Sequence, residues 1–492
     1  MTLRKLLFLA AIFSMLVGCG DNYSSGDRVL VSKCSYETGI TPPRRFDVVV
    51  FKYPGHFPHE GPMEKHSPKN YIKRLLGLPG ELLAMFFGRL YHRVPAPNEA
   101  PFFDDVKAGV HPNNLWRHPN IHMGDDHPSG KWFQEGKFTI LRKPPTVIMS
   151  LRRIVYDNDF QAKDLKDLKI GERWNPAADS TWKKDQATGF FSDGKADGGV
   201  DWLRYQHLVR PEGGLRGGMV VPPMLILDAL DYNTFQMNNR VNDDINPTIY
   251  SQGHWVGDLM LEANVEVLET KGEFWFELSK GINRFRCCFD LATGNCSLYR
   301  EGMDKKLVKL DEKPTRVKSK GMYLLRFANI DARLTVWVGP DLPFGDGFEY
   351  DPPEVRGKDE NMKNLSDADL LARRGPTKND LEPASVGSKA SSVKVTQLHL
   401  WRDIYYRTRI DHPYTDYDQR VDKDHWIDPA KFDTFKNQQF TTMYVQPGHY
   451  LCLGDNSQSS SDSRVWGLVP ERLMLGRALM VYFPLERVGP IR

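Results

Sequence analysis

Short apolar runs of strand length recur along most of the chain, and they constrain its fold more than any other feature of the sequence. The runs are rich in β-branched and aromatic residues and are bounded by Gly, Pro, Asn or Asp, which is the pattern of β-strands joined by turns. The 33 prolines and 40 glycines agree with many turns. At 492 residues the chain is too long for one ordinary core. We therefore expect a mainly β protein of two or three domains.

Three zones follow one another along the chain. Residues 20–95 carry strand-like runs, and the Pro-, His- and Asn-rich residues 96–139 are expected to form a loop excursion. Residues 140–407 repeat strand signals with little helical pattern, which predicts an inserted antiparallel β-sandwich. Residues 408–440 are expected to be a linker, after which residues 441–492 return to short strands.

Five runs carry the prediction of the sandwich. They are residues 259–267, 274–278, 323–327, 334–338 and 398–401. The two runs that flank residues 329–332 are expected to form a hairpin. The stretch 341–392 is rich in Pro, Asp, Gly and Ser and is expected to be an exposed loop. In this patterning the second zone resembles a concanavalin-type lectin or glucanase jelly roll.

The N-terminus has the features of an export signal. Two basic residues precede an apolar run at residues 6–17, and the run is shorter than the roughly 18 residues that span a bilayer. It ends in Leu16-Val17-Gly18-Cys19, which resembles a lipobox, so we expect Cys19 to be lipidated and to begin the mature chain. The alternative is an uncleaved anchor with Cys19 as an ordinary thiol. In both cases residues 1–19 predict an extracytoplasmic protein attached to a membrane of a bacterial cell envelope.

The overall charge and the cysteines limit the classes of partner. Lys+Arg number 66 and Asp+Glu 63, a formal net charge of +3, so the charge gives no indication of a nucleic-acid partner. The six cysteines show no CxxC spacing, which leaves zinc or thioredoxin-like chemistry without support. Cys287 or Cys288 could form a disulfide with Cys296, and buried free thiols are the alternative.

Two long segments, one near each end of the chain, resemble motifs of a known family. Tyr71-Ile72-Lys73-Arg74-Leu75-Leu76-Gly77-Leu78-Pro79-Gly80-Glu81 is similar to the segment that bears the catalytic lysine of bacterial type I signal peptidases. Residues 26–30 and 45–54 resemble the family's two preceding strand motifs, and residues 454–470 resemble its last motif. The resemblance implies one signal-peptidase-like β domain built from both chain ends and interrupted by the sandwich.

The family's catalytic machinery is a serine and lysine dyad. A lysine is normally protonated at neutral pH, but burial against apolar strands lowers its pKa, so that the amine can accept a proton from a serine hydroxyl. Lys73 is the expected base, with Ile72, Leu75 and Leu76 as its apolar wall. The serine would attack a peptide carbonyl and form an acyl-enzyme. The alternative for Lys73 is a solvated strand lysine.

Three further residues take their expected roles from the resemblance. Ser460 matches the family serine that hydrogen-bonds the lysine amine and aims it. Asp462 and Arg464 match a charge pair that holds this loop in place, which is a structural role. The alternative for Ser460, in a Ser-rich turn, is a local hydrogen bond to the backbone.

The sequence departs from the family at the nucleophile. The family places a Ser-Met-x-Pro-Thr segment before its Gly-Asp pair, and no such segment precedes Gly26 here. Counting back from Gly26 by the family's spacing places the position of the family serine at Gly18. Ser14 lies within the export signal and would be removed with it. Ser25 is therefore the expected nucleophile, with Ser24 as the alternative. A turn residue is the competing interpretation of Ser25.

The sequence favours a membrane-attached serine endopeptidase that cleaves signal peptides from exported preproteins and needs no cofactor. The rival is a lipoprotein that keeps the scaffold without a nucleophile and uses the sandwich to bind a glycan or a protein. A glycosidase is a third possibility, without a carboxylate pair at the required spacing. Four tryptophans could stack on sugar, although packing is the commoner role: Trp255, Trp275, Trp337 and Trp401. Three loop histidines are not expected to bind metal: His118, His122 and His127.

Overall fold

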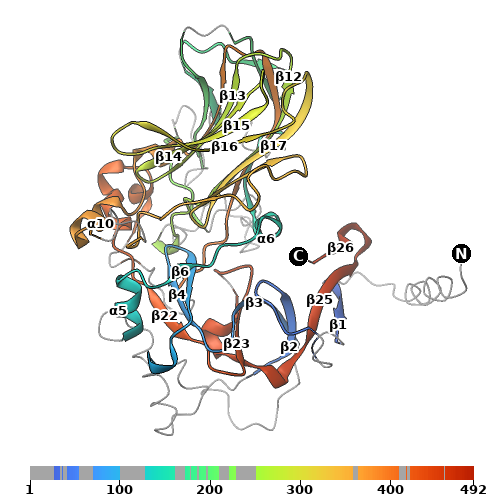
Figure 1. Cartoon of the computed structure of the whole chain (residues 1–492), viewed down its shortest axis with the longest axis vertical. Helices are drawn as coiled ribbons and strands as arrows, with labels where there is room; N and C mark the ends of the chain where they lie inside the picture. Colours follow the sequence, from blue (N-terminus) through green and yellow to red (C-terminus); the bar gives the residue numbers. More distant parts are fainter. Residues whose placement is uncertain are drawn as a thin grey trace, which may run out of the picture.

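The computed structural model describes residues 27–33, 36, 41–54, 70–99, 128–160, 172–177, 179–185, 188–194, 198–209, 221–228, 251–357, 364–408, 417, 421–458 and 460–491. Figure 1 shows two β-rich parts stacked along the long axis of the molecule, with the sandwich above and a smaller part below. The expected mainly β fold, with both chain ends in one domain and a sandwich in the middle, is confirmed.

Both ends of the chain build the lower part. Its seven-stranded antiparallel sheet has the order β1-β25-β2-β3-β23-β24, and β26 pairs with β25. The strands are β1 (Arg28–Ser32), β2 (Val48–Lys52), β3 (Asn70–Gly77), β23 (His449–Leu453), β24 (Val469–Pro470), β25 (Met474–Phe483) and β26 (Gly489–Pro490). Because β3 pairs with β2 on one side and with β23 on the other, segments from opposite ends of the sequence are hydrogen-bonded to each other.

A second, four-stranded sheet completes the lower part in the order β22-β4-β5-β6. Its strands are β4 (Leu82–Phe86), β5 (Arg89–Arg93), β6 (Thr139–Ile140) and β22 (Thr441–Tyr444). The helices of this part are η2 (Pro97–Glu99), α5 (Pro128–Gln134), α6 (Pro145–Leu151), α11 (Ser463–Trp466), η8 (Glu471–Leu473) and η9 (Leu485–Arg487). A cluster of buried side chains that includes Leu76, Leu83, Leu451 and Leu453 joins the two sheets.

The upper part is a sandwich of two antiparallel sheets. The first has the order β19-β18-β17-β12-β21-β10-β9, with β7 paired to β21, and the second β16-β15-β14-β13-β20-β11-β8. The strands of the first sheet are β7 (Arg153–Asp157), β9 (Lys183–Asp185), β10 (Gly189–Ser192), β12 (Leu259–Val267), β17 (Gly321–Ile330), β18 (Arg333–Val338), β19 (Phe348–Glu349) and β21 (Val393–Arg402). Those of the second are β8 (Trp174–Pro176), β11 (Asp201–Tyr205), β13 (Glu273–Lys280), β14 (Asn283–Asp290), β15 (Asn295–Glu301), β16 (Leu307–Pro314) and β20 (Ala384–Lys389).

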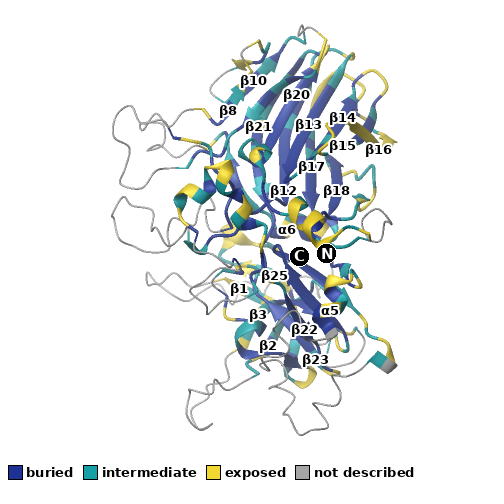
Figure 2. Cartoon of the chain, turned by 90° about the vertical axis from the view of Figure 1, so that its left-hand side faces the viewer, coloured by how far each residue is buried: buried dark blue, intermediate teal, exposed yellow. Residues whose placement is uncertain are grey.

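The largest buried cluster lies between these two sheets. Figure 2 shows that many residues of the sandwich strands are buried. In β21 the side chains of Val393 and Val395 point into this core, as do Leu398 and Leu400. The core-facing residues thus change from odd to even numbers, and the change occurs at Gln397, which is exposed and has a φ of 50°. One extra residue at this bulge keeps the apolar side chains of both halves of the strand on the core face.

The predicted hairpin is confirmed, since β17 and β18 are joined by Asp331 and Ala332, both with positive φ, as in a two-residue turn of type I′. The prediction of an exposed loop over residues 341–392 is wrong for β20. This strand is buried between β13 and β11 in the middle of its sheet. The same stretch also holds α10 (Asp367–Arg373), with a capping box at Ser366, and η5 (Lys378–Leu381).

Residues 408–440, which we expected to be a linker, include η6 (Lys423–Trp426) and η7 (Pro429–Phe435). Trp426 and Phe435 are buried there against Leu225 and Trp255 of the insert. The domain boundaries themselves stay predictions.

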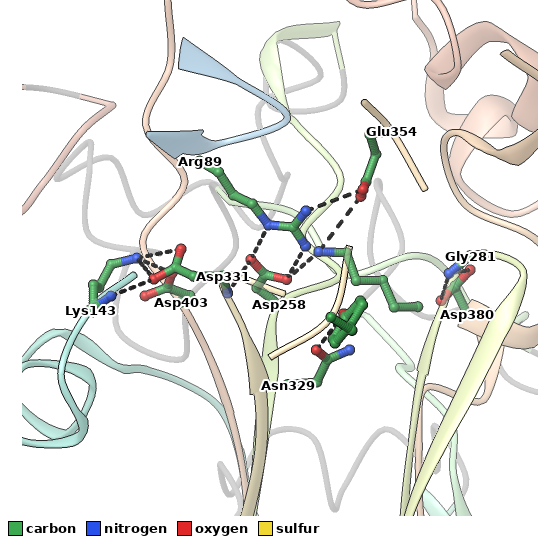
Figure 3. A network of polar contacts seen from close by, with 11 residues as sticks. Arg89, Lys143, Asp258, Gly281, Asn329, Asp331, Glu354, Asp380 and Asp403 are labelled. Carbon is green, nitrogen blue, oxygen red and sulfur yellow. Dashed lines mark hydrogen bonds and ion pairs between the residues drawn. The ribbon is translucent and has the colours of Figure 1, made fainter. Parts of the chain in front are cut away.

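A buried network of charged side chains joins the two parts of the molecule (Figure 3). Arg89 of β5 donates to both carboxylate oxygens of Asp258, at 2.9 and 2.8 Å, and to Glu354 at 3.2 Å. Lys143 makes ion pairs with Asp331 and with Asp403, at 2.8 and 2.7 Å. Because these ions are buried, each depends on its partner for stabilisation. The contacts of Arg89 therefore hold the upper part against the lower part.

Candidate active site

Lys73 and Ser460 lie in contact, although they come from segments near opposite ends of the chain. Lys73 lies in the middle of β3, and Ser460 lies on the loop that follows β23. Lys73 Nζ donates a hydrogen bond of 3.0 Å to Ser460 Oγ. The pairing of β3 with β23 brings the start of the loop that carries Ser460 next to β3.

The surroundings of Lys73 favour the neutral amine. Burial lowers the pKa of Lys73 below its ordinary value, the charge of Arg464 lowers it further, and Asp462 and Asp455 oppose the shift. Leu75, one of the apolar neighbours we expected, is fully buried, whereas Ile72 is 43% exposed and does not form the buried wall that we predicted.

The pair Asp462 and Arg464 holds the described residues of the loop that carries Ser460. Asp462 is fully buried and accepts two side-chain hydrogen bonds from Arg464, at 3.0 and 2.7 Å, and one from the main-chain N–H of Gly454 at 2.9 Å. Arg464 also donates to the hydroxyl and the carbonyl oxygen of Ser457. A side chain at Gly454 would overlap Ser460 Oγ, so this position requires glycine.

Sequence reasoning missed a second anchor of the same loop. Arg74 donates two hydrogen bonds of 2.9 Å to the carboxylate of Asp455 and one to the carbonyl oxygen of Phe46. Neighbouring residues of a strand point to opposite faces, so Arg74 binds the loop from the face opposite to Lys73. The signal was available, because Arg74 lies in the motif segment 71–81 and Asp455 in the motif segment 454–470.

The expected nucleophile lies outside the described residues, and so do Ser24, Ser14, Gly18 and Cys19. The same holds for the three loop histidines that were expected not to bind metal. Ser25, like them, keeps its role as a prediction.

Two other groups of residues can be placed. The Sγ atoms of Cys287 and Cys296 lie 3.3 Å apart as free buried thiols, and Cys288 beside them is also free. Among the four tryptophans, Trp255, Trp275 and Trp337 are buried, in agreement with a packing role. Trp401 is partly buried and packs against the cluster of Met260 and Trp337, with the guanidinium of Arg152 over its ring.

The profile of the family described as signal peptidase, peptidase S26, matches residues 7–107 and 393–483. Both ends of the chain resemble signal peptidases. The resemblance expected from the motifs is thereby confirmed. The matched stretches include β3 with Lys73 and the loop with Ser460, so the two halves of the 3.0 Å contact both lie in signal-peptidase-like sequence.

Curated relatives match over short segments. A probable signal peptidase I-2 of Synechocystis is 43% identical over 51 residues, which is 10% of this chain and 23% of that protein. Subunit 1 of the mitochondrial inner membrane protease of Xenopus tropicalis is 45% identical over 49 residues, which is 10% of this chain and 29% of that protein. The chain thus spans about a quarter of the length of these relatives.

Solved structures similar to the chain include carbohydrate-binding module CBM66 of Bacillus subtilis, with 8% identity, a TM-score of 0.23, and coverage of 47% of this chain and 93% of that one. Galectin LEC-6 of Caenorhabditis elegans has 12% identity, a TM-score of 0.19, and coverage of 33% and 91%. The sandwich is established by its own strand order. Among the described residues, no helix has both the length and the apolar character that crossing a membrane requires.

Proposed function

We propose that the chain is a membrane-attached serine endopeptidase that cleaves signal peptides from exported preproteins after small residues. The observation that carries the proposal is the hydrogen bond of 3.0 Å from Lys73 to Ser460, made between two segments that both match the signal peptidase family. The lowered pKa of Lys73 supports it, because a base must be neutral when it accepts a proton.

In the proposed reaction Ser25 is the nucleophile. Lys73 Nζ accepts the proton of the Ser25 hydroxyl as its oxygen attacks the scissile carbonyl, and Ser460 keeps the amine aimed. Main-chain N–H groups near the nucleophile stabilise the oxyanion. Lys73 then returns the proton to the leaving amine, and water hydrolyses the acyl-enzyme. No metal or organic cofactor takes part in these steps.

We further propose that Cys19 carries lipid and attaches the chain to an envelope membrane. The lipobox-like sequence supports the lipid on Cys19, and the similarity to a protease of the mitochondrial inner membrane supports the attachment to a membrane. Intact mass measurement of protein extracted from membranes is the test. An unprocessed form that still contains Met1 and unmodified Cys19 would favour an uncleaved anchor instead.

The nucleophile is the most demanding part of the proposal. The strand β1 begins at Arg28, and β25 and β2 lie between β1 and β3 in the sheet. The residues before Arg28 must therefore bring Ser25 across these strands to Lys73. In the rival account, no serine reaches Lys73, and the chain is a lipoprotein scaffold whose sandwich binds a glycan or a protein.

Cleavage of a preprotein by the purified full chain in detergent tests Ser25 directly. We expect Ser25→Ala to abolish cleavage and Ser24→Ala to weaken it, while Ser461→Ala, an exposed serine beside Ser460, leaves it unchanged. The variant Ser25→Ala/Lys73→Ala should be no worse than either single variant, because the two residues act as a unit. Undiminished cleavage by Ser25→Ala would reject this nucleophile, and a wild-type protein that never cleaves would favour the rival account.

A further inference from the structure

A polar cavity of about 280 Å³ lies between the insert and the loop that carries Ser460. The described residues that line it on the insert side include Arg153, Asp228 and Arg402, and the loop side is the run 455–458. By comparison, one water requires roughly 10–15 Å³. Asn456 in this lining is exposed to solvent.

Both carboxylates of the lining already have a cationic partner. Asp455 accepts two hydrogen bonds of 2.9 Å from Arg74. Asp228 accepts two from Arg407, at 2.7 and 3.0 Å. Burial alone would raise the pKa of Asp228, but Arg407 and His254 bring it below its ordinary value, so Asp228 stays ionised and matched to Arg407.

Arg153 brings an additional positive charge to this cavity. It lies at the start of β7, and its Nη2 donates 3.0 Å to the main-chain carbonyl oxygen of Asp455. A carbonyl oxygen is a neutral acceptor, and among the described residues no carboxylate forms an ion pair with Arg153. A guanidinium has five N–H donors, and this bond uses one of them. Arg402 contributes a second guanidinium, which donates to the carbonyl oxygens of Asp228 and Asp403.

We propose that this cavity binds a small oxyanion, a carboxylate or phosphate group, through the guanidinium of Arg153. The planar fork of arginine donors matches the paired oxygens of both groups. Asn456, Ser457 and Gln458 add polar side chains to the same wall. The bound anion would brace the loop on the face of β3 that Arg74 occupies, opposite to Lys73. This binding does not depend on the proposed peptidase activity.

Calorimetric titration of the full chain with inorganic phosphate and with acetate, at constant ionic strength, tests the site. We expect saturable binding of at least one of them by the wild-type protein and at least about tenfold weaker binding by Arg153→Gln. Arg153→Lys should retain part of the affinity, because it keeps the charge and loses the fork. Arg300→Gln, at an exposed arginine of β15, should bind like the wild type.

Three controls separate the outcomes. Circular dichroism and the thermal midpoint establish that Arg153→Gln is folded, and Arg153→Lys provides the milder change if it is not. Lys73→Ala should bind the anion normally, which separates this site from the proposed catalytic function. The proposal is overturned if the wild type shows no saturable binding, if folded Arg153→Gln binds as tightly as the wild type, or if chloride at equal concentration displaces the anions.

Discussion

Lys73 and Ser460 stand 387 positions apart in the sequence, and their side chains are joined by a hydrogen bond of 3.0 Å. The insert lies between them in the sequence but not in space, because β3 and β23 are neighbours in one sheet. This relationship lets a large sandwich occupy the middle of the chain while the candidate base Lys73 and the serine that aims it stay in contact.

The first prediction concerns Gly454, which leaves room for Ser460. A methyl group at this position would overlap Ser460 Oγ, so Gly454→Ala should push Ser460 away from Lys73. We expect loss of most cleavage activity and a destabilisation of about 1–3 kcal/mol, as for other overpacked sites. Cleavage assays and urea unfolding measure the two effects.

Gly489→Ala is the matched control, because nothing lies within 4 Å of the Cβ that it would add. It should leave activity and stability unchanged. Full activity of Gly454→Ala would mean that the contact between Lys73 and Ser460 is not needed for cleavage.

The second prediction concerns the protonation of Lys73. Its pKa in the folded protein is lowered, chiefly by burial. The unfolded chain therefore binds this proton more tightly, and the contribution of Lys73 to stability should rise with pH between the folded pKa and about 10.5. NMR titration of ¹³C-methylated lysines, with Lys73→Arg to assign the signal, should give a midpoint below 10.5. A midpoint at or above that value would contradict the account of a neutral base.

The third prediction concerns the buried network between the two parts of the molecule. Arg89→Met would remove the hydrogen bonds from Arg89 to Asp258 and Glu354 and leave Lys280 as their remaining cation. The expected loss is about 1–3 kcal/mol, with the sandwich and the lower part unfolding in separate transitions. Urea unfolding followed by fluorescence measures both. Arg300→Met, which alters an exposed side chain, is the control. If Arg89→Met destabilised the protein no more than Arg300→Met, the network would not hold the two parts together.

The sequence predicted the strands in which every second residue, or every residue, is buried. The run 259–267 coincides with β12, and the hairpin after Ile330 was evident from its turn residues. It did not predict β20, whose residues 384–389 are small or polar for the most part. Ser385 accepts a hydrogen bond from Arg204 of the neighbouring strand β11, and the hydroxyl of Ser388 bonds Ser192 of β10 in the facing sheet. Gly387 lies beneath Trp202. Such burial depends on tertiary partners, which composition does not reveal.

The residues around the candidate site also fall into two groups, those that the sequence predicted and those that only the structure revealed. Lys73, Ser460 and the pair of Asp462 with Arg464 were found because they lie in segments that resemble the family's motifs. Arg153 belongs to no motif, and its contact with the carbonyl oxygen of Asp455 exists only after the insert has packed on the lower part. The same is true of Arg89 and its buried partners.

The most direct test of the central claim is kcat/KM for a preprotein, measured with the purified full chain and with Lys73→Ala. Lys52→Ala, at an exposed lysine on the neighbouring strand β2, is the control. The account predicts that Lys73→Ala abolishes cleavage, a loss in kcat/KM of at least about 10²- to 10⁴-fold, the contribution of a general base. Lys52→Ala should not change kcat/KM. Equal rates for the wild type and Lys73→Ala, or no cleavage by the wild type, would contradict the account.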